Sequence, residues 1–198
     1  MDTAGAIVRS VFGPQPKTKL RAARPRCAAM LAIVGALAAA APSAVAASSV
    51  KPRLTAAQRQ LLGSGELWAT IDVCNPPDQP NTLGVRGSMP GDGHARDRMY
   101  MLFRVQYQEG SRWIDLASDA HAPWVPVGGG GSSRQDGSSF QITPVTGRPA
   151  FALRGVVQFQ WRHAGRVLLS VSRATTAGHK SLAGADPATF SAATCSIG

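Results

Sequence analysis

The chain has 198 residues, with 21 Lys and Arg against 11 Asp and Glu, and its formal net charge is +10. A charge this positive can indicate a nucleic-acid or membrane-surface partner. The arginines of this chain are, however, scattered without a basic stripe or a recognition motif, so we expect no nucleic-acid partner.

The first 46 residues resemble a secretory leader. Basic residues between Lys17 and Arg26 precede an uncharged run, Cys27–Ala41, and the small-x-small sequence Ala44-Val45-Ala46 follows. We therefore predict that residues 1–46 are a signal peptide cleaved after Ala46, with Ala47 as the alternative site, and that the protein is secreted. The other interpretation is an uncleaved leader that anchors the chain in the cell envelope, but the uncharged run is shorter than the roughly 20 residues that a spanning helix needs.

Cleavage would change both the charge and the cysteine count. Six basic residues and one acid leave with the leader, so the remaining chain carries 15 − 10 = +5, and we expect no stable membrane insertion after cleavage. Cys27 leaves too, which makes Cys74 and Cys195 an even pair in an oxidising compartment. We predict a disulfide between them. Neither has a second cysteine or a histidine at ligand spacing, so the sequence suggests no metal site and no cofactor.

Residues 47–65 are predicted to be an N-terminal segment with one short helix, Thr55–Leu62. Thr55 and Gln58 have the spacing of a capping box, and Gly63 stands where the helix should stop. Residues 66–198 follow as one β-sandwich domain, since the length suits a single core.

Alternation of apolar and polar residues predicts the strands of that domain. The pattern is strong over Glu66–Cys74, Arg98–Gln108, Phe151–Arg162 and Arg166–Thr175, where Val167, Leu169 and Val171 are expected to point inward. It is weaker over 82–89, 113–116, 124–127, 139–144 and 189–197. The glycine-rich stretch 128–137 lacks the Lys-Ser/Thr sequel of a phosphate-binding loop and is interpreted as a flexible connection.

About eight strands separated by Gly/Pro turns, with no strand–helix–strand alternation, predict an all-β fold. The expected architecture is an antiparallel immunoglobulin-like β-sandwich with one short N-terminal helix. A small β-barrel is the alternative.

The sequence shows none of the common hydrolase motifs, such as Gly-x-Ser-x-Gly or His-Glu-x-x-His. Its four histidines fall in turn or loop stretches and are expected to be solvated. We therefore expect a module that is not an enzyme. The alternative is a secreted hydrolase whose active site is built on the loop Asn75–Arg98, for example from Ser88, Asp92 and His94.

One set of side chains could bind a ligand. Polar residues alternate with the apolar residues of two long strands, and they are Tyr100, Arg104, Gln106, Gln158, Gln160 and Arg162. If the two strands are neighbours, these residues form a surface for an extracellular glycan, a wall polymer or a protein. The alternative is an ordinary solvated sheet face. The sequence carries no signal for an oligomeric state.

Several segments resemble a family of secreted, uncharacterised proteins of high-GC Gram-positive bacteria. The resemblance lies in 67–75, 80–91, 98–107 and 153–161 and extends to 183–187 and Cys195, so that it covers most of residues 66–196. It implies export and a β-sandwich. It implies no activity and no functional residues.

Overall fold

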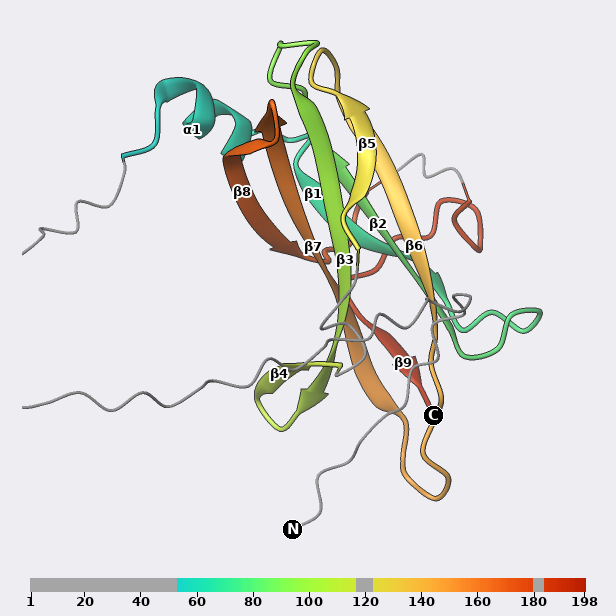
Figure 1. Cartoon of the computed structure of the whole chain (residues 1–198). Helices are drawn as coiled ribbons and strands as arrows, with labels where there is room; N and C mark the ends of the chain where they lie inside the picture. The colour runs from blue at the N-terminus through green and yellow to red at the C-terminus, as the bar shows by residue number, and fades with distance from the viewer. Residues whose placement is uncertain (1–52, 117–122, 180–183) are drawn as a thin grey trace, which may run out of the picture. The chain divides into compact units, whose positions relative to one another are not determined.

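A computed structural model describes residues 53–116, 123–179 and 184–198 (Figure 1). The predicted signal peptide, its cleavage site and His121 lie outside these residues. Within them, no helix has the length and apolar character needed to cross a bilayer.

The short helix predicted near residue 55 is present as α1, Ala56–Leu62. Thr55 caps it, and the capping box with Gln58 is confirmed, as is the stop at Gly63. A helix this short is not stable alone, so its position depends on tertiary contacts. The Gln58 side chain donates to the carbonyl of Leu168 at 2.9 Å, and Arg173 donates to the carbonyl of Leu62 at 3.0 Å. Both bonds fix α1 against strand β8, Arg166–Ala174.

The described residues form nine strands in two antiparallel sheets. The smaller sheet has the order β1-β2-β6, with β1 Trp68–Cys74, β2 Thr82–Met89 and β6 Arg134–Gln141. The larger sheet has the order β4-β3-β7-β8, with β4 Arg112–Asp115, β3 Arg98–Glu109 and β7 Phe151–His163. Two further strands complete it: β5, Val125–Gly129, pairs with the start of β3, and β9, Cys195–Ile197, pairs with the start of β7. In Figure 1, β5 and β4 accordingly lie along the two ends of β3.

The two sheets enclose a single apolar core, which confirms the predicted antiparallel β-sandwich. The core takes alternate residues from both sheets, among them Ile71, Val85, Met101, Phe159 and Trp161. The sheets approach closely at two glycines. A Cβ on Gly87 would lie 3.1 Å from side-chain atoms of Met101 and Phe159, and one on Gly155 would lie 2.6 Å from Val85.

The predicted flexible connection at 128–137 is wrong. Gly128 and Gly129 belong to β5, and β6 begins at Arg134, before the expected residue 139. The glycines are required by close packing against the loop 90–97: a Cβ on Gly91 would lie 2.5 Å from the carbonyl oxygen of Gly130, and one on Gly129 would lie 2.9 Å from that of Ala95. The absence of side chains thus serves close contact with the loop 90–97, and not flexibility.

The expected inward position of Val167 is also wrong. Its register with β7 shifts between Trp161 and Arg162, so Val167 pairs with Arg162 and is 51% exposed, while Leu169 remains in the core. The expected closing strand 189–197 is shorter as well, since only Cys195–Ile197 forms a strand, although Ala192 bridges Ile71 at the edge of β1.

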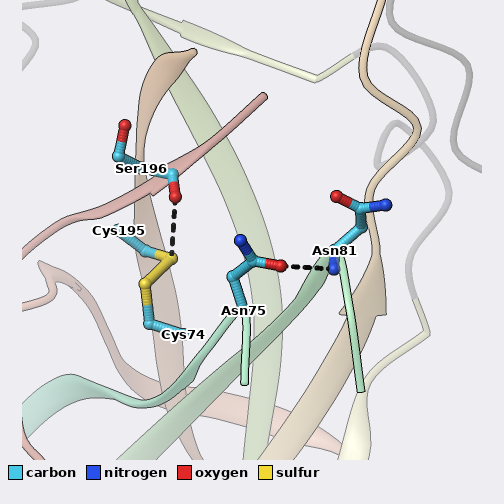
Figure 2. The surroundings of a disulfide bond; sticks show 5 residues. All are labelled: Cys74, Asn75, Asn81, Cys195 and Ser196. Atoms are coloured by element: carbon cyan, nitrogen blue, oxygen red, sulfur yellow. Dashed lines mark hydrogen bonds between the residues drawn. A yellow bond between two sulfur atoms is a disulfide. The ribbon is translucent and has the colours of Figure 1, made fainter. Parts of the chain in front are cut away.

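The disulfide between Cys74 and Cys195 is confirmed, with the two Cα atoms 5.6 Å apart. It joins the end of β1 in one sheet to β9 in the other, across 121 residues of sequence (Figure 2). Beside it, the backbone N–H of Asn81 donates to the side chain of Asn75 at 2.6 Å, which closes the loop between β1 and β2. The disulfide therefore holds the two layers of the sandwich together at one end.

Candidate functional site

The six residues proposed from sequence lie on two neighbouring strands. Strands β3 and β7 pair directly, with Tyr100 opposite Gln160 and Leu102 opposite Gln158. Along both strands the six alternate with buried residues, so they share the outer face of the larger sheet. We call this surface the polar face and define it by Tyr100, Arg104, Gln106, Arg154, Gln158, Gln160 and Arg162.

One end of the polar face is organised by Arg162. Its guanidinium carbon lies 4.1 Å from the centroid of the Tyr100 ring and 4.9 Å from that of Trp124. Its Nε donates to the side-chain oxygen of Gln160 at 2.7 Å. A cation flanked by two aromatic rings is held by their electron-rich faces. Arg162 is therefore fixed in direction, and its terminal amino groups make no hydrogen bond within the described part of the chain.

The other end of the polar face is a chain of charged and amide groups. Asp115 accepts from Gln106 at 2.7 Å and from Arg104 at 3.2 Å. Gln106 in turn accepts from Nε of Arg154 at 2.8 Å, and the Arg154 guanidinium lies 4.4 Å from the centroid of the Trp113 ring. Burial lowers the pKa of Arg154, and the neighbouring Asp115 opposes that shift. These contacts order the groups before any ligand arrives.

Sequence reasoning missed three residues that contact members of the polar face. Trp113 lies in β4 and Trp124 directly precedes β5, and the place of both strands beside β3 depends on pairing that the chain order does not reveal. Ser170 of β8 accepts from both Gln158 and Gln160, at 3.1 and 3.4 Å. Both tryptophans begin segments for which a strand was predicted, 113–116 and 124–127, and this was the available signal.

A second site lies at the end of the sandwich that carries α1. A cleft of about 970 Å³ separates α1 from the loop 90–97 and from the adjoining ends of β7 and β8. Apolar side chains of Leu61, Trp161 and Leu169 line one part of it, and Asp92, His94, Asp97 and His163 line another. Such a combination of apolar wall and a few polar groups is typical of ligand sites.

The backbone of the loop 90–97 is held from two sides. Trp161 donates from its ring nitrogen to the carbonyl of Pro90 at 3.0 Å. Gly93 donates to Gly130 at 3.0 Å, and Gly130 donates to Asp97 at 2.9 Å. The loop is therefore a rigid platform, which is what a preorganised site requires.

Four titratable side chains meet on this platform. Nδ1 of His163 lies 2.5 Å from Oδ1 of Asp97, and Nδ1 of His94 lies 3.8 Å from Oδ1 of Asp92. The pKa of Asp92 is raised, chiefly because it is buried, and the adjacent Asp97 adds to the shift. The pKa of Asp97 is lowered, chiefly by its hydrogen bond with His163. Two neighbouring carboxyls thus differ in their affinity for a proton.

The histidine predictions are only partly right. His94 and His163 are exposed, as expected, although His163 ends strand β7 and bonds Asp97. His179 is half-buried and stacks on Trp68 with ring centroids 4.4 Å apart. Of the hypothetical set Ser88, Asp92 and His94, the cleft contains Asp92 and His94. Ser88 does not line it and is buried with an unpartnered hydroxyl in the described part of the chain.

Comparison with known proteins leaves both sites without an assignment: no protein-family model, curated protein or solved structure matches this chain. Function has to be inferred from the residues themselves.

Proposed function

We propose that this protein is a secreted, non-enzymatic module that binds an anionic or hydroxyl-rich polymer, such as a glycan or wall polymer, at the cell envelope. The polar face is the binding surface. The observation that carries the proposal is the position of Arg162, whose guanidinium lies over the rings of both Tyr100 and Trp124 and whose terminal amino groups donate to no partner among the described residues. A protein partner is the other class of ligand that such a surface could take.

The physical basis is preorganisation. Binding normally costs the ordering of long side chains, and the aromatic and hydrogen-bond contacts of Arg162 and Arg154 meet that cost in advance. A planar guanidinium held in one direction can bond two oxygens of a carboxylate, sulfate or phosphate at once. The amide of Gln160 bonds Arg162, and that of Gln158 lies further along the same face of β7; amide groups suit sugar hydroxyls.

The test is retention on insoluble wall polysaccharide and on immobilised anionic glycans, at low and high salt. We expect the wild-type protein to bind at low salt and to elute as salt rises, since exposed charge pairing is screened. The double variant Arg104→Ala/Arg162→Ala should lose most of this retention.

A matched control removes the same charge elsewhere. Arg59→Ala/Arg148→Ala changes two arginines that lie outside the polar face, on α1 and on the loop before β7. Equal retention of the two double variants would contradict the proposal, because net charge alone would then explain binding.

Export and ancestry belong to the same proposal. The proposal includes export through the predicted signal peptide 1–46 and an immunoglobulin-like relationship of the sandwich. The resemblance to secreted proteins of high-GC Gram-positive bacteria supports the export. The disulfide is compatible with it, since such bonds persist in oxidising compartments. N-terminal sequencing of secreted protein should find Ala47 or Ser48 as the first residue, and an intact Met1 in the membrane fraction would favour the anchored alternative.

A second candidate function is that of a secreted hydrolase with its active site in the cleft. It is favoured by the bond between Asp97 and His163, because a carboxylate on one ring nitrogen orients the imidazole and leaves Nε2 available as a general base. Hydrolysis of wall polymer that is abolished by His163→Ala and retained by Arg104→Ala/Arg162→Ala would support it over the binding module.

A further inference from the structure

The loop 90–97 gathers donors of mixed type in a small volume. Ligand atoms of Asp92, His94 and Asp97 all lie within 4.8 Å of one another. Tetrahedral metal sites with bonds of about 2.0–2.2 Å place their donor atoms roughly 3.5 Å apart. The three donors therefore need to close by about an ångström, and His94, with 75% of its side chain exposed, is free to make that movement.

Charge gives an independent reason for a cation here. The side chains of Asp92 and Asp97 are 10% and 7% exposed, and their ligand oxygens lie within 4.8 Å of each other. Their ion-pair partners are the histidines His94 and His163. Two carboxylates that are shielded from water repel each other, and a divalent cation between them would attract both and offset that repulsion.

We propose that Asp92, His94 and Asp97 form a divalent transition-metal site at the edge of the cleft, with His163 holding Asp97 in position. Asp92 and Asp97 supply carboxylate oxygens and His94 an imidazole nitrogen. His163 acts through its hydrogen bond to Asp97, and such partners orient a ligating carboxylate. The rigid backbone of the loop, tied to Trp161 and Gly130, keeps the two carboxylates in place.

The donor set indicates the class of metal. Two oxygens and one nitrogen suit Zn²⁺ or Mn²⁺, whereas Ca²⁺ takes six to eight oxygens. Three protein ligands leave at least one position for water or a ligand in the cleft of about 970 Å³. The site depends on neither proposed function, since a metal could serve ligand binding, hydrolysis or structure.

The test is direct binding of the metal alone. Purified protein is stripped with chelator, dialysed and titrated calorimetrically with Zn²⁺, Mn²⁺, Ca²⁺ and Mg²⁺. We expect one Zn²⁺ or Mn²⁺ per chain and binding of Ca²⁺ and Mg²⁺ at least about tenfold weaker. Metal should also raise the thermal midpoint, because it binds the folded state preferentially.

Variants separate this site from ordinary surface histidines. His94→Ala removes an exposed ligand without touching the core, so it should fold normally and bind at least about tenfold more weakly, and Asp97→Asn should be weaker still. His163→Ala should weaken binding about tenfold through the lost positioning. His179→Ala is the control and should bind like wild type. Absence of binding, or binding that His94→Ala and Asp97→Asn leave unchanged, would overturn the proposal.

Discussion

The guanidinium of Arg162 lies over the ring of Tyr100, with its central carbon 4.1 Å from the ring centroid. The two residues come from neighbouring strands, since Arg162 is opposite Arg98 and Tyr100 is opposite Gln160. The contact is therefore a diagonal pair across β3 and β7. It brings a positive charge and an aromatic surface together at one fixed place on the polar face.

This contact should contribute measurably to stability. A double-mutant cycle of Arg162→Ala and Tyr100→Leu, followed by urea unfolding, should give a coupling free energy of about 0.5–1 kcal/mol, as expected for a partly exposed cation–π pair. The same cycle with Arg166→Ala in place of Arg162→Ala should give none. Zero coupling in the first cycle would mean that the stacked geometry contributes nothing to stability in solution.

The close approach of the two sheets at Gly155 gives a second prediction. An alanine there would place its Cβ 2.6 Å from Val85 and 2.8 Å from Thr175, and these atoms belong to packed side chains. Gly155→Ala should therefore lower the free energy of unfolding by about 1–3 kcal/mol. Gly65→Ala is the matched control, because nothing lies within 4 Å of its added Cβ. Its free energy of unfolding should change by no more than about 0.5 kcal/mol. An equally small change for Gly155→Ala would contradict the prediction.

Local patterns predicted most of the fold. Alternation along Arg98–Glu109 and Phe151–His163 determines which face is buried, and the capping residues Thr55 and Gln58 depend only on neighbours three positions away. The glycines at 128–131 were misinterpreted because their role depends on the loop 90–97, which lies far away in sequence. Composition cannot distinguish a flexible glycine from one that permits close contact.

The polar face and the cleft also differ in how far the sequence predicted them. The polar face follows from alternation on two strands, and only the pairing of β3 with β7 had to be found in the structure. His163 and Asp97 are 66 residues apart, and they meet because the end of β7 lies against the loop between β2 and β3. No rule of sequence spacing predicts this contact, so the sequence analysis could point to the loop Asn75–Arg98 but not to His163.

The disulfide should be a major source of stability. In the chain-entropy account, a bond that closes a loop of 121 residues stabilises the fold by about 4 to 5 kcal/mol. Replacing Cys74 and Cys195 together by alanine should shift the urea midpoint down accordingly. Reductant should produce a comparable shift in the wild-type protein and none in the double variant. A wild-type midpoint that reductant leaves unchanged would show that the bond contributes little.

His179 should make stability depend on pH, and the sign follows from its surroundings. The imidazole stacks on Trp68 with 14° between the ring planes, and its Nε2 lies 2.9 Å from the hydroxyl of Thr176. Burial lowers its pKa below the ordinary value of 6.5. The unfolded chain therefore takes up a proton at higher pH than the folded chain does. The contribution of this group is fully present above pH 6.5 and is lost as pH falls through the folded-state pKa.

We accordingly predict that the wild-type protein loses more stability than His179→Gln between about pH 7 and pH 5, because the glutamine cannot be protonated. NMR titration of the His179 ring should give a pKa below 6.5. Trp68→Leu should move that pKa back toward the ordinary value, since it uncovers the imidazole. Trp113→Leu, beside the polar face, should leave it unchanged. A wild-type pKa at or above 6.5 would indicate that His179 is solvated and that Trp68 does not cover it.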